Sequence, residues 1–249
     1  MARLRLLVVA CPVLQREIEL LALEASTAVT TRWLDMGLHE GSTEGLRSAL
    51  QAAIDRTRPG EFDAIAIAYG LCNRGIVGLT ARSAPVVLPK AHDCIGLLLG
   101  STQGYLARLE LEPGTYFQSA GWLEHVPANG EVRPQMSFGR GATLTRERLA
   151  DRYGEENADY LLEQWANLTK HYARLAFIAT PAPEAKEWEA IARERAQKCG
   201  WEFERLAGEL GWLRRLVNAE WNDGEFLKLS PGERVVLRFD PHLIGTERA

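Results

Sequence analysis

Three cysteines and one histidine stand where a metal site could form. Cys11 and Cys72 each come soon after a short apolar run, and His92-Asp93-Cys94 comes soon after a third. Three thiolates and an imidazole suit a zinc site of mixed sulfur and nitrogen ligands. Three cysteines suit a [4Fe-4S] cluster equally well, with one iron free or bound by histidine. No C-x-x-C pair identifies the metal, and the histidine beside Cys94 favours zinc only narrowly.

The local context of two of these sulfurs favours the thiolate. Cys11 precedes Pro12 and Cys94 follows Asp93, so both are expected at helix starts, where the helix dipole stabilises negative charge. The alternative is that these cysteines are small apolar core residues with no chemical role, because free cysteine is among the most buried residue types. The sequence places no cysteine or histidine within reach of Cys199, so this residue is expected to be structural or merely exposed.

Four further residues are candidates for binding a cofactor or substrate. Gly70 permits an unusual backbone before the second cysteine, and Arg74 could hold an anion. His39 follows the second expected strand, and Lys90 stands directly before the histidine triplet, where it could bind a phosphate or carboxylate. A solvent-exposed role fits His39 and Lys90 as well.

The elements that would position these residues alternate between strands and helices. Such alternation is typical of βαβ units and predicts an α/β fold with a Rossmann-like parallel sheet. If the first strand lies beside the third and the third beside the fourth, the carboxyl ends bring the cysteine loops to one edge. Strands are expected at residues 4–10, 27–34, 63–69 and 85–88, and helices at 12–25, 42–56 and 94–109.

The remainder of the chain allows a second Rossmann-like half. Residues 113–140 are rich in glycine, proline and aromatic residues and are expected to form loops and short strands, where Tyr116 and Trp122, with Tyr105, could wall a pocket. We therefore expect an N-terminal α/β half at 1–140 that carries the site and a C-terminal α/β half at 141–249. Later elements are expected at 145–172 (helix), 175–179 (strand), 186–199 (helix), 201–206 (strand), 210–221 (helix) and 234–239 (strand).

The composition of the chain and the absence of several known catalytic and nucleotide-binding motifs argue against several classes of function. The 249 residues are 46% hydrophobic with a net charge of -4, which fits a soluble globular protein and argues against nucleic acid or anionic membrane as partner. No apolar run is long enough for a membrane helix, and the first strand lacks a signal-peptide cleavage site, so we expect a cytoplasmic protein. Walker, G-x-G-x-x-G, G-x-S-x-G and H-E-x-x-H motifs are missing from the sequence.

Several short pieces resemble an uncharacterised bacterial and archaeal family, a domain of unknown function often encoded near corrinoid-dependent methyltransferase genes. That resemblance implies a loose association with one-carbon or corrinoid metabolism. The pieces are Ala10-Cys11, Leu38-His39, Tyr69-Gly70-Leu71-Cys72, Ala91-His92-Asp93-Cys94-Ile95, Gly100-Ser101, Pro113-Gly114-Thr115-Tyr116, Gly121-Trp122 and Trp221-Asn222-Asp223 with Phe226.

A chemical parallel extends this association. Some methyl-corrinoid:thiol methyltransferases bind zinc through a His-x-Cys pair and a distant cysteine, and His92-Asp93-Cys94 with Cys72 or Cys11 is similar in ligand type, although order and spacing differ. We expect a metal-binding protein in methyl-group or thiol chemistry, acting on a small molecule or with a corrinoid protein. An iron–sulfur protein in redox or sulfur chemistry and a non-catalytic accessory partner of a corrinoid protein stay open.

Overall fold

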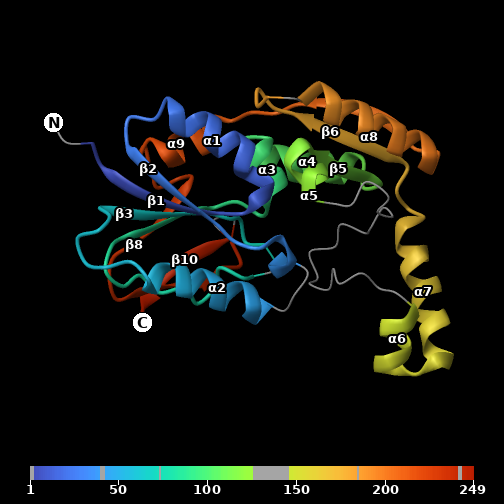
Figure 1. The fold of residues 1–249 in the computed structure, drawn as a ribbon, viewed down its shortest axis with the longest axis horizontal. Helices are drawn as coiled ribbons and strands as arrows, with labels where there is room; N and C mark the ends of the chain where they lie inside the picture. Colours follow the sequence, from blue (N-terminus) through green and yellow to red (C-terminus); the bar gives the residue numbers. More distant parts are fainter. Residues whose placement is uncertain (1–2, 40–42, 73, 126–145, 184, 241–242) are drawn as a thin grey trace.

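The chain forms two mainly parallel β-sheets and a β-hairpin, with helices packed on the sheets (Figure 1). This arrangement confirms the predicted α/β class. The computed structural model describes residues 3–39, 43–72, 74–125, 146–183, 185–240 and 243–249. None of the helices described there combines the length and apolar character needed to cross a membrane.

The first sheet has the strand order β2-β1-β3-β4-β8. Its first four members have the flavodoxin-like order, in which the first strand lies beside the third and the third beside the fourth, as the convergence of the cysteine loops requires. Both faces are covered, so β1 and β3 consist almost wholly of buried apolar residues. The parallel strands are β1 (Arg5–Ala10), β2 (Ala28–Trp33), β3 (Ala64–Ala68) and β4 (Val86–Pro89), and β8 (Phe226–Leu229) pairs antiparallel with β4.

Helices lie on both faces of this sheet. Successive β1 side chains point to opposite faces, so Val8 joins the core beneath α1 and α9, whereas Val9 joins the core against α2. Figure 1 shows α1 and α9 on one side of the strands and α2 on the other. The elements are α1 (Gln15–Leu23), α2 (Thr43–Asp55), α9 (Gly211–Val217) and the 3-10 turns η1 (Pro12–Leu14) and η2 (Met36–His39).

The second sheet is fully parallel, with the order β5-β6-β7. Helix α8 covers one face, where Tyr116 and Phe177 belong to a shared apolar core. Tyr105 of α4 meets Phe117 on the other face, with ring centroids 5.4 Å apart. The elements are β5 (Thr115–Ser119), α5 (Ala120–His125), β6 (Arg174–Ala179), α8 (Ala185–Cys199) and β7 (Glu202–Ala207).

Each sheet draws strands from both sides of residue 140. β5 precedes that position and pairs with β6, whereas β8 follows it and returns to the edge of the first sheet. The strands predicted from the sequence did not include β8. The last two strands, β9 (Glu233–Leu237) and β10 (Ile244–Arg248), form an antiparallel hairpin. Backbone hydrogen bonds between Val235 and both Gly78 and Leu79 connect this hairpin to the loop after β3.

Two helices expected to be continuous are broken, and that part of the sequence reading was wrong. The 94–109 helix is α3 (Cys94–Leu98) and α4 (Thr102–Leu111), because Gly100 adopts a φ of 72° and the Ser101 hydroxyl caps a new helix. The 145–172 helix is α6 (Arg146–Tyr153) and α7 (Glu155–Thr169), separated by Gly154 with a φ of 87°.

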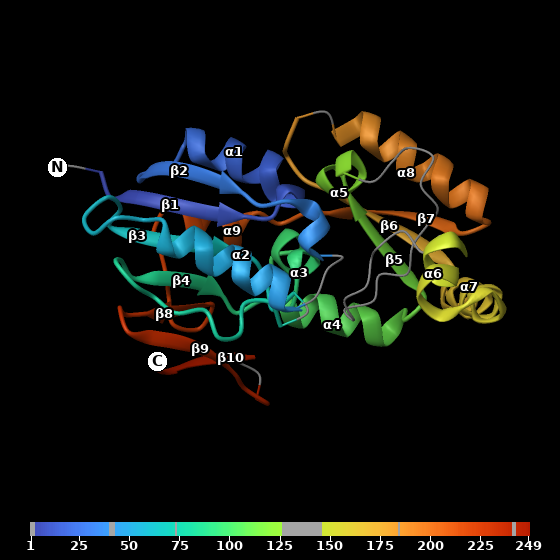
Figure 2. The same cartoon turned by 60° about the horizontal axis from the view of Figure 1, so that its bottom comes forward.

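The carboxyl ends of the two parallel sheets meet at a tight junction (Figure 2). A Cβ on Gly121, just after β5, would lie 2.0 Å from the carbonyl oxygen of Val13, just after β1. The Thr180 hydroxyl, just after β6, donates a 2.7 Å hydrogen bond to Glu17 of α1, whose side chain is fully buried. Both edges therefore contribute residues to one region of the molecule.

Glu17 makes this junction sensitive to pH. Burial raises the pKa of its carboxyl above the ordinary value of 4.5, so the folded chain holds that proton more tightly than the unfolded chain. This contribution to stability is complete below the ordinary pKa and is lost as pH rises through the folded value. In urea titrations, the wild type should lose stability relative to Glu17→Gln as pH rises from 4.5 upward. The exposed neighbour variant Glu19→Gln should follow the wild type, and a pH-independent difference for Glu17→Gln would contradict the assignment.

Candidate functional site

The structure brings Cys11, Cys72 and Cys94 to the carboxyl edge of the first sheet. Cys11 directly follows β1, Cys72 lies in the loop after β3, and Cys94 begins α3 after β4. Cys11 is 1% exposed and Cys72 8% exposed, and Cys94 is partly buried and packs against the same apolar cluster as the other two. All three are free thiols. Parallel pairing of neighbouring strands thus gathers them from three loops.

The thiols are close enough to influence one another. Burial raises the pKa of each thiol, and the charge of Asp93 raises the pKa of Cys72 and Cys94 further. Charge on a neighbouring cysteine adds to this, Cys94 acting on Cys11, Cys11 on Cys72 and Cys72 on Cys94. Burial thus opposes the stabilisation of thiolates that was expected at the helix starts. The turn after Cys11 has three residues and α3 has five, so their dipoles are small beside the effect of burial.

Hydrogen bonds from the backbone partly offset the effect of burial on the pKa of these thiols. Hydrogen bonding from the Val13 backbone lowers the pKa of Cys11, and hydrogen bonding from the Cys94 backbone lowers that of Cys72. Cys72 itself adopts a left-handed φ of 39°, which is strained for a residue with a side chain. Amide groups aimed at sulfur are a way of stabilising negative charge there.

The loop after β3 is held against the loop after β4. The Leu71 amide donates to the Ala91 carbonyl at 2.8 Å, and the Cys72 amide donates to the His92 carbonyl at 3.2 Å. At Gly70 a Cβ would lie 2.6 Å from both the Cα and the backbone nitrogen of Asp93. A glycine is therefore required at this point for the two loops to meet.

Asp93 organises the histidine side of the site. One carboxylate oxygen accepts hydrogen bonds from the Ile95 and Gly96 amides at 2.9 and 3.1 Å and caps α3, and the other lies 2.9 Å from His92 Nδ1. This contact raises the pKa of His92. With Nδ1 donating to Asp93, Nε2 is the ring nitrogen left to bind a metal or a proton.

Tyr105 also belongs to this network, which the sequence did not reveal. Its hydroxyl hydrogen-bonds to Asp93, and its ring centroid lies 6.3 Å from that of His92. The sequence singled out Tyr105 only as a pocket wall. Its helix, α4, is separated from the histidine by the break at Gly100, so no local spacing indicates the contact.

The other predicted residues have different surroundings. The Lys90 ammonium donates to the Asp223 carbonyl at 2.6 Å, which ties β4 to the loop before β8. Arg74 is exposed and has a left-handed φ of 62°. His39 ends η2, and its side chain lies outside the described part of the structure.

The donor atoms do not yet form a coordination sphere. Among the described residues, no group of three or more His, Cys, Asp or Glu side chains is arranged to hold a metal ion as it stands. Metal binding would therefore require side-chain rotation at the cysteine edge.

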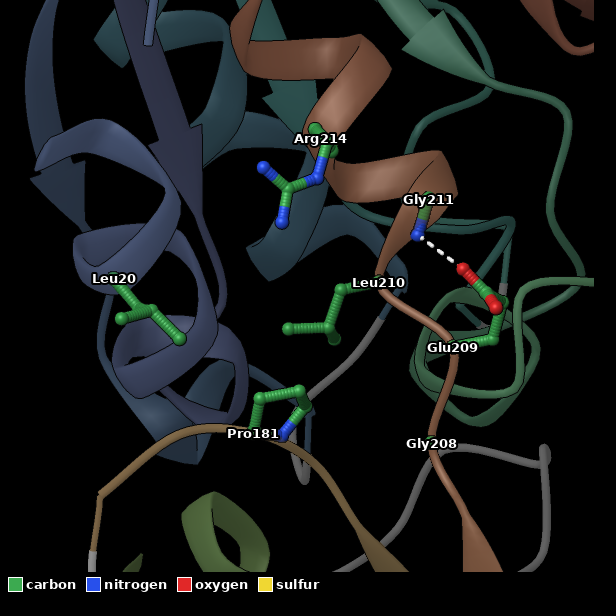
Figure 3. A pocket seen from close by; sticks show the side chains of 7 residues that line it. All are labelled: Leu20, Pro181, Gly208, Glu209, Leu210, Gly211 and Arg214. Atoms are coloured by element: carbon green, nitrogen blue, oxygen red, sulfur yellow. Dashed lines mark hydrogen bonds between the residues drawn. The ribbon is translucent and has the colours of Figure 1, made fainter. Parts of the chain in front are cut away.

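A pocket between α1, α9 and the loops after β6 and β7 lies apart from the predicted residues (Figure 3). Its Glu209 side chain accepts a 2.8 Å hydrogen bond from the Gly211 amide, and its Arg214 pairs with Glu24 at 3.3 Å. The charged groups there are already engaged within the protein. The lining residues are Leu20, Pro181, Gly208, Glu209, Leu210, Gly211 and Arg214.

Fold and site together define an α/β protein with two opposed parallel sheets and a cysteine-rich edge between them. The profile of one family, described as protein of unknown function (DUF1638), matches residues 33–217, and the chain belongs to this family. The match includes Cys72, His92 and Cys94 and begins after Cys11. No curated protein and no solved structure matches the chain. The family resemblance predicted from the sequence is confirmed.

The contact at Gly70 can be tested by adding one methyl group. Gly70→Ala places a Cβ against rigid backbone, so we expect a loss of about 1–3 kcal/mol in the free energy of unfolding by urea. Gly104→Ala is the control, because a Cβ there meets only the Ser101 side chain at 3.5 Å. That variant should be unchanged or stabilised by up to about 1 kcal/mol. Equal stability of Gly70→Ala and wild type would show that the loops are not held in this contact.

Proposed function

We propose that this protein binds a metal through Cys11, Cys72 and Cys94, with His92 as fourth ligand, and acts in methyl-group or thiol chemistry. The observation that carries the proposal is the convergence of three thiols, two buried and one partly buried, from three separate loops at one sheet edge. Zinc is the metal we favour, because thiolates with one imidazole suit its preference for sulfur and nitrogen ligands.

The chemistry of the donor set supports this choice. Three thiols confined together in an apolar region hold their protons, and a divalent cation would compensate the charge of the thiolates that replace them. The Asp93 carboxylate supports His92 in the way that carboxylates commonly orient metal-binding histidines.

The residues of the chain have separable tasks in such a site. A bound zinc would supply Lewis acidity, and a substrate thiol whose pKa it lowers would take the position of His92 or join as a fifth ligand. Asp93 fixes the orientation of His92, while Trp122 and Leu71 pack against the apolar cluster that contains Cys11 and Cys72 and would limit access of water. The Gly70 contact keeps Cys72 beside the His92–Cys94 segment. A small thiol or methyl donor, or a corrinoid protein that carries the methyl group, is the partner we propose.

An iron–sulfur cluster is the second candidate. The hydrogen bonding of backbone amides to Cys11 and Cys72 favours it, since such bonds to sulfur tune the potential of these clusters. Its chemistry would be redox or sulfur transfer. The four free thiols also support our proposal that the protein works in the reducing cytoplasm.

Metal analysis with a visible spectrum, on protein purified without oxygen, tests this function. We expect about one zinc per chain in colourless protein, and loss of that zinc in Cys11→Ser, Cys72→Ser and Cys94→Ser. Cys199→Ser is the matched control, because that thiol is exposed at the end of α8. Iron with acid-labile sulfide and a brown colour would establish the second candidate instead. Protein free of metal would remove both and leave the accessory role for a corrinoid protein.

A further inference from the structure

The pocket at the carboxyl end of the second sheet has no role in the metal site (Figure 3). Its walls come from α1, from the loops that follow β6 and β7, and from the start of α9. Ligands of open α/β sheets bind beyond the carboxyl ends of the strands, and pockets form preferentially where separate structural units meet. The volume is about 220 Å³. Sites for drug-sized molecules have roughly 300–1,000 Å³, so a ligand here must be small.

Three apolar side chains face one another across this pocket. Leu20 lies on α1, Pro181 in the loop after β6, and Leu210 directly before α9. Figure 3 shows all three directed toward the same space. The wall behind them is close-packed, because a Cβ on Gly208 would lie 2.8 Å from Thr180 Cγ2. An apolar group of a ligand would therefore be removed from water between these walls.

The Glu209 carboxylate does not face the apolar walls. Figure 3 shows it on the opposite side of the loop from them. It accepts the 2.8 Å hydrogen bond of the Gly211 amide, and a Cβ on Gly100 would overlap the Glu209 side chain. The Glu209 amide donates to the Leu98 carbonyl at 2.8 Å. These contacts hold Glu209 against the end of α3, so its charge is directed away from the pocket.

Arg214 is the charged side chain on the pocket side of this loop. It lies on α9, and its guanidinium extends toward α1. Its Nη1 pairs with one carboxylate oxygen of Glu24 at 3.3 Å, and the two side chains are 52% and 66% exposed. Exposed ion pairs of this kind contribute little to stability, and a guanidinium carries five N–H donors. Arg214 can therefore offer its charge and donors to a ligand in place of Glu24.

We propose that this pocket binds a small monocarboxylate with a short apolar tail. The carboxylate pairs with Arg214, because the donors of a guanidinium match both oxygens of a carboxylate. The tail lies between Leu20, Pro181 and Leu210. A single cation balances one negative charge, whereas the second charge of a phosphate would be left beside Glu24 without a counter-charge. This ligand site does not depend on the metal.

NMR titration of the ¹⁵N-labelled full chain with potassium butyrate, at ionic strength held constant with potassium chloride, tests the proposal. The backbone amide signals of Gly208 and Gly211 should shift saturably, because both residues line the pocket. Acetate carries the same charge with almost no tail, so it should bind several-fold more weakly than butyrate. Butylammonium carries the tail with the opposite charge and should give no saturable shift.

Two charge variants should move the affinity for butyrate in opposite directions. Arg214→Met removes the cation and should weaken binding about tenfold, whereas Glu24→Gln removes the competing carboxylate and should strengthen binding. Arg205→Met and Glu19→Gln are the matched controls, because they remove exposed charges from β7 and α1 outside the pocket lining, and they should retain the wild-type affinity. Shifts that do not saturate, equal affinity for acetate or butylammonium, or equal affinity in Arg214→Met and wild type would overturn the proposal.

Discussion

The contact between Gly70 and the backbone of Asp93 is the constraint on which the candidate metal site depends. A Cβ at Gly70 would overlap that backbone at 2.6 Å, so the loops after β3 and β4 meet as closely as protein chains can. Hydrogen bonds donated by the backbone amides of Leu71 and Cys72 extend the pairing of β3 and β4 beyond the ends of these strands. Cys72 and Cys94 belong to these two loops, and β1 supplies Cys11 from the neighbouring position in the sheet.

The loops at the carboxyl end of the second sheet contact the segment that follows β1 and so enclose this region. Gly121 lies against the Val13 carbonyl, and Thr180 bonds to the buried Glu17, so the carboxyl edges of both sheets face one interior. This enclosure raises the pKa of the thiols, and a bound metal would replace their protons.

The sequence predicted the features that depend on local pattern. Alternating apolar runs and helices predicted the four parallel strands, and the positions of the cysteines followed from the strand ends, whereas the strand order was only assumed. β8 was missed because it is four residues long and pairs with β4 from a distant part of the chain. The helix break at Gly100 and Ser101 was present in the sequence as a glycine followed by a capping residue.

Other features of the site could not be read from spacing. Position at a helix start suggested reactive thiolates, but burial is set by the whole fold and opposes them. The proximity of the Tyr105 hydroxyl to Asp93 arises from a contact between separate elements. Lys90 stood beside the histidine triplet in sequence, yet its ammonium bonds to the Asp223 carbonyl instead.

X-ray absorption at the zinc edge, on protein loaded with one equivalent of zinc, tests the central claim most directly. The account predicts a shell of three sulfur atoms at about 2.3 Å and one nitrogen at about 2.0–2.1 Å. At the higher zinc concentration needed to load the weakened Cys11→Ser variant, the sulfur count should fall by one, because Cys11 supplies one of the three sulfur ligands. A shell of oxygen and nitrogen atoms alone, or a sulfur count that the Cys11→Ser, Cys72→Ser and Cys94→Ser variants leave unchanged, would contradict a shared site at this edge.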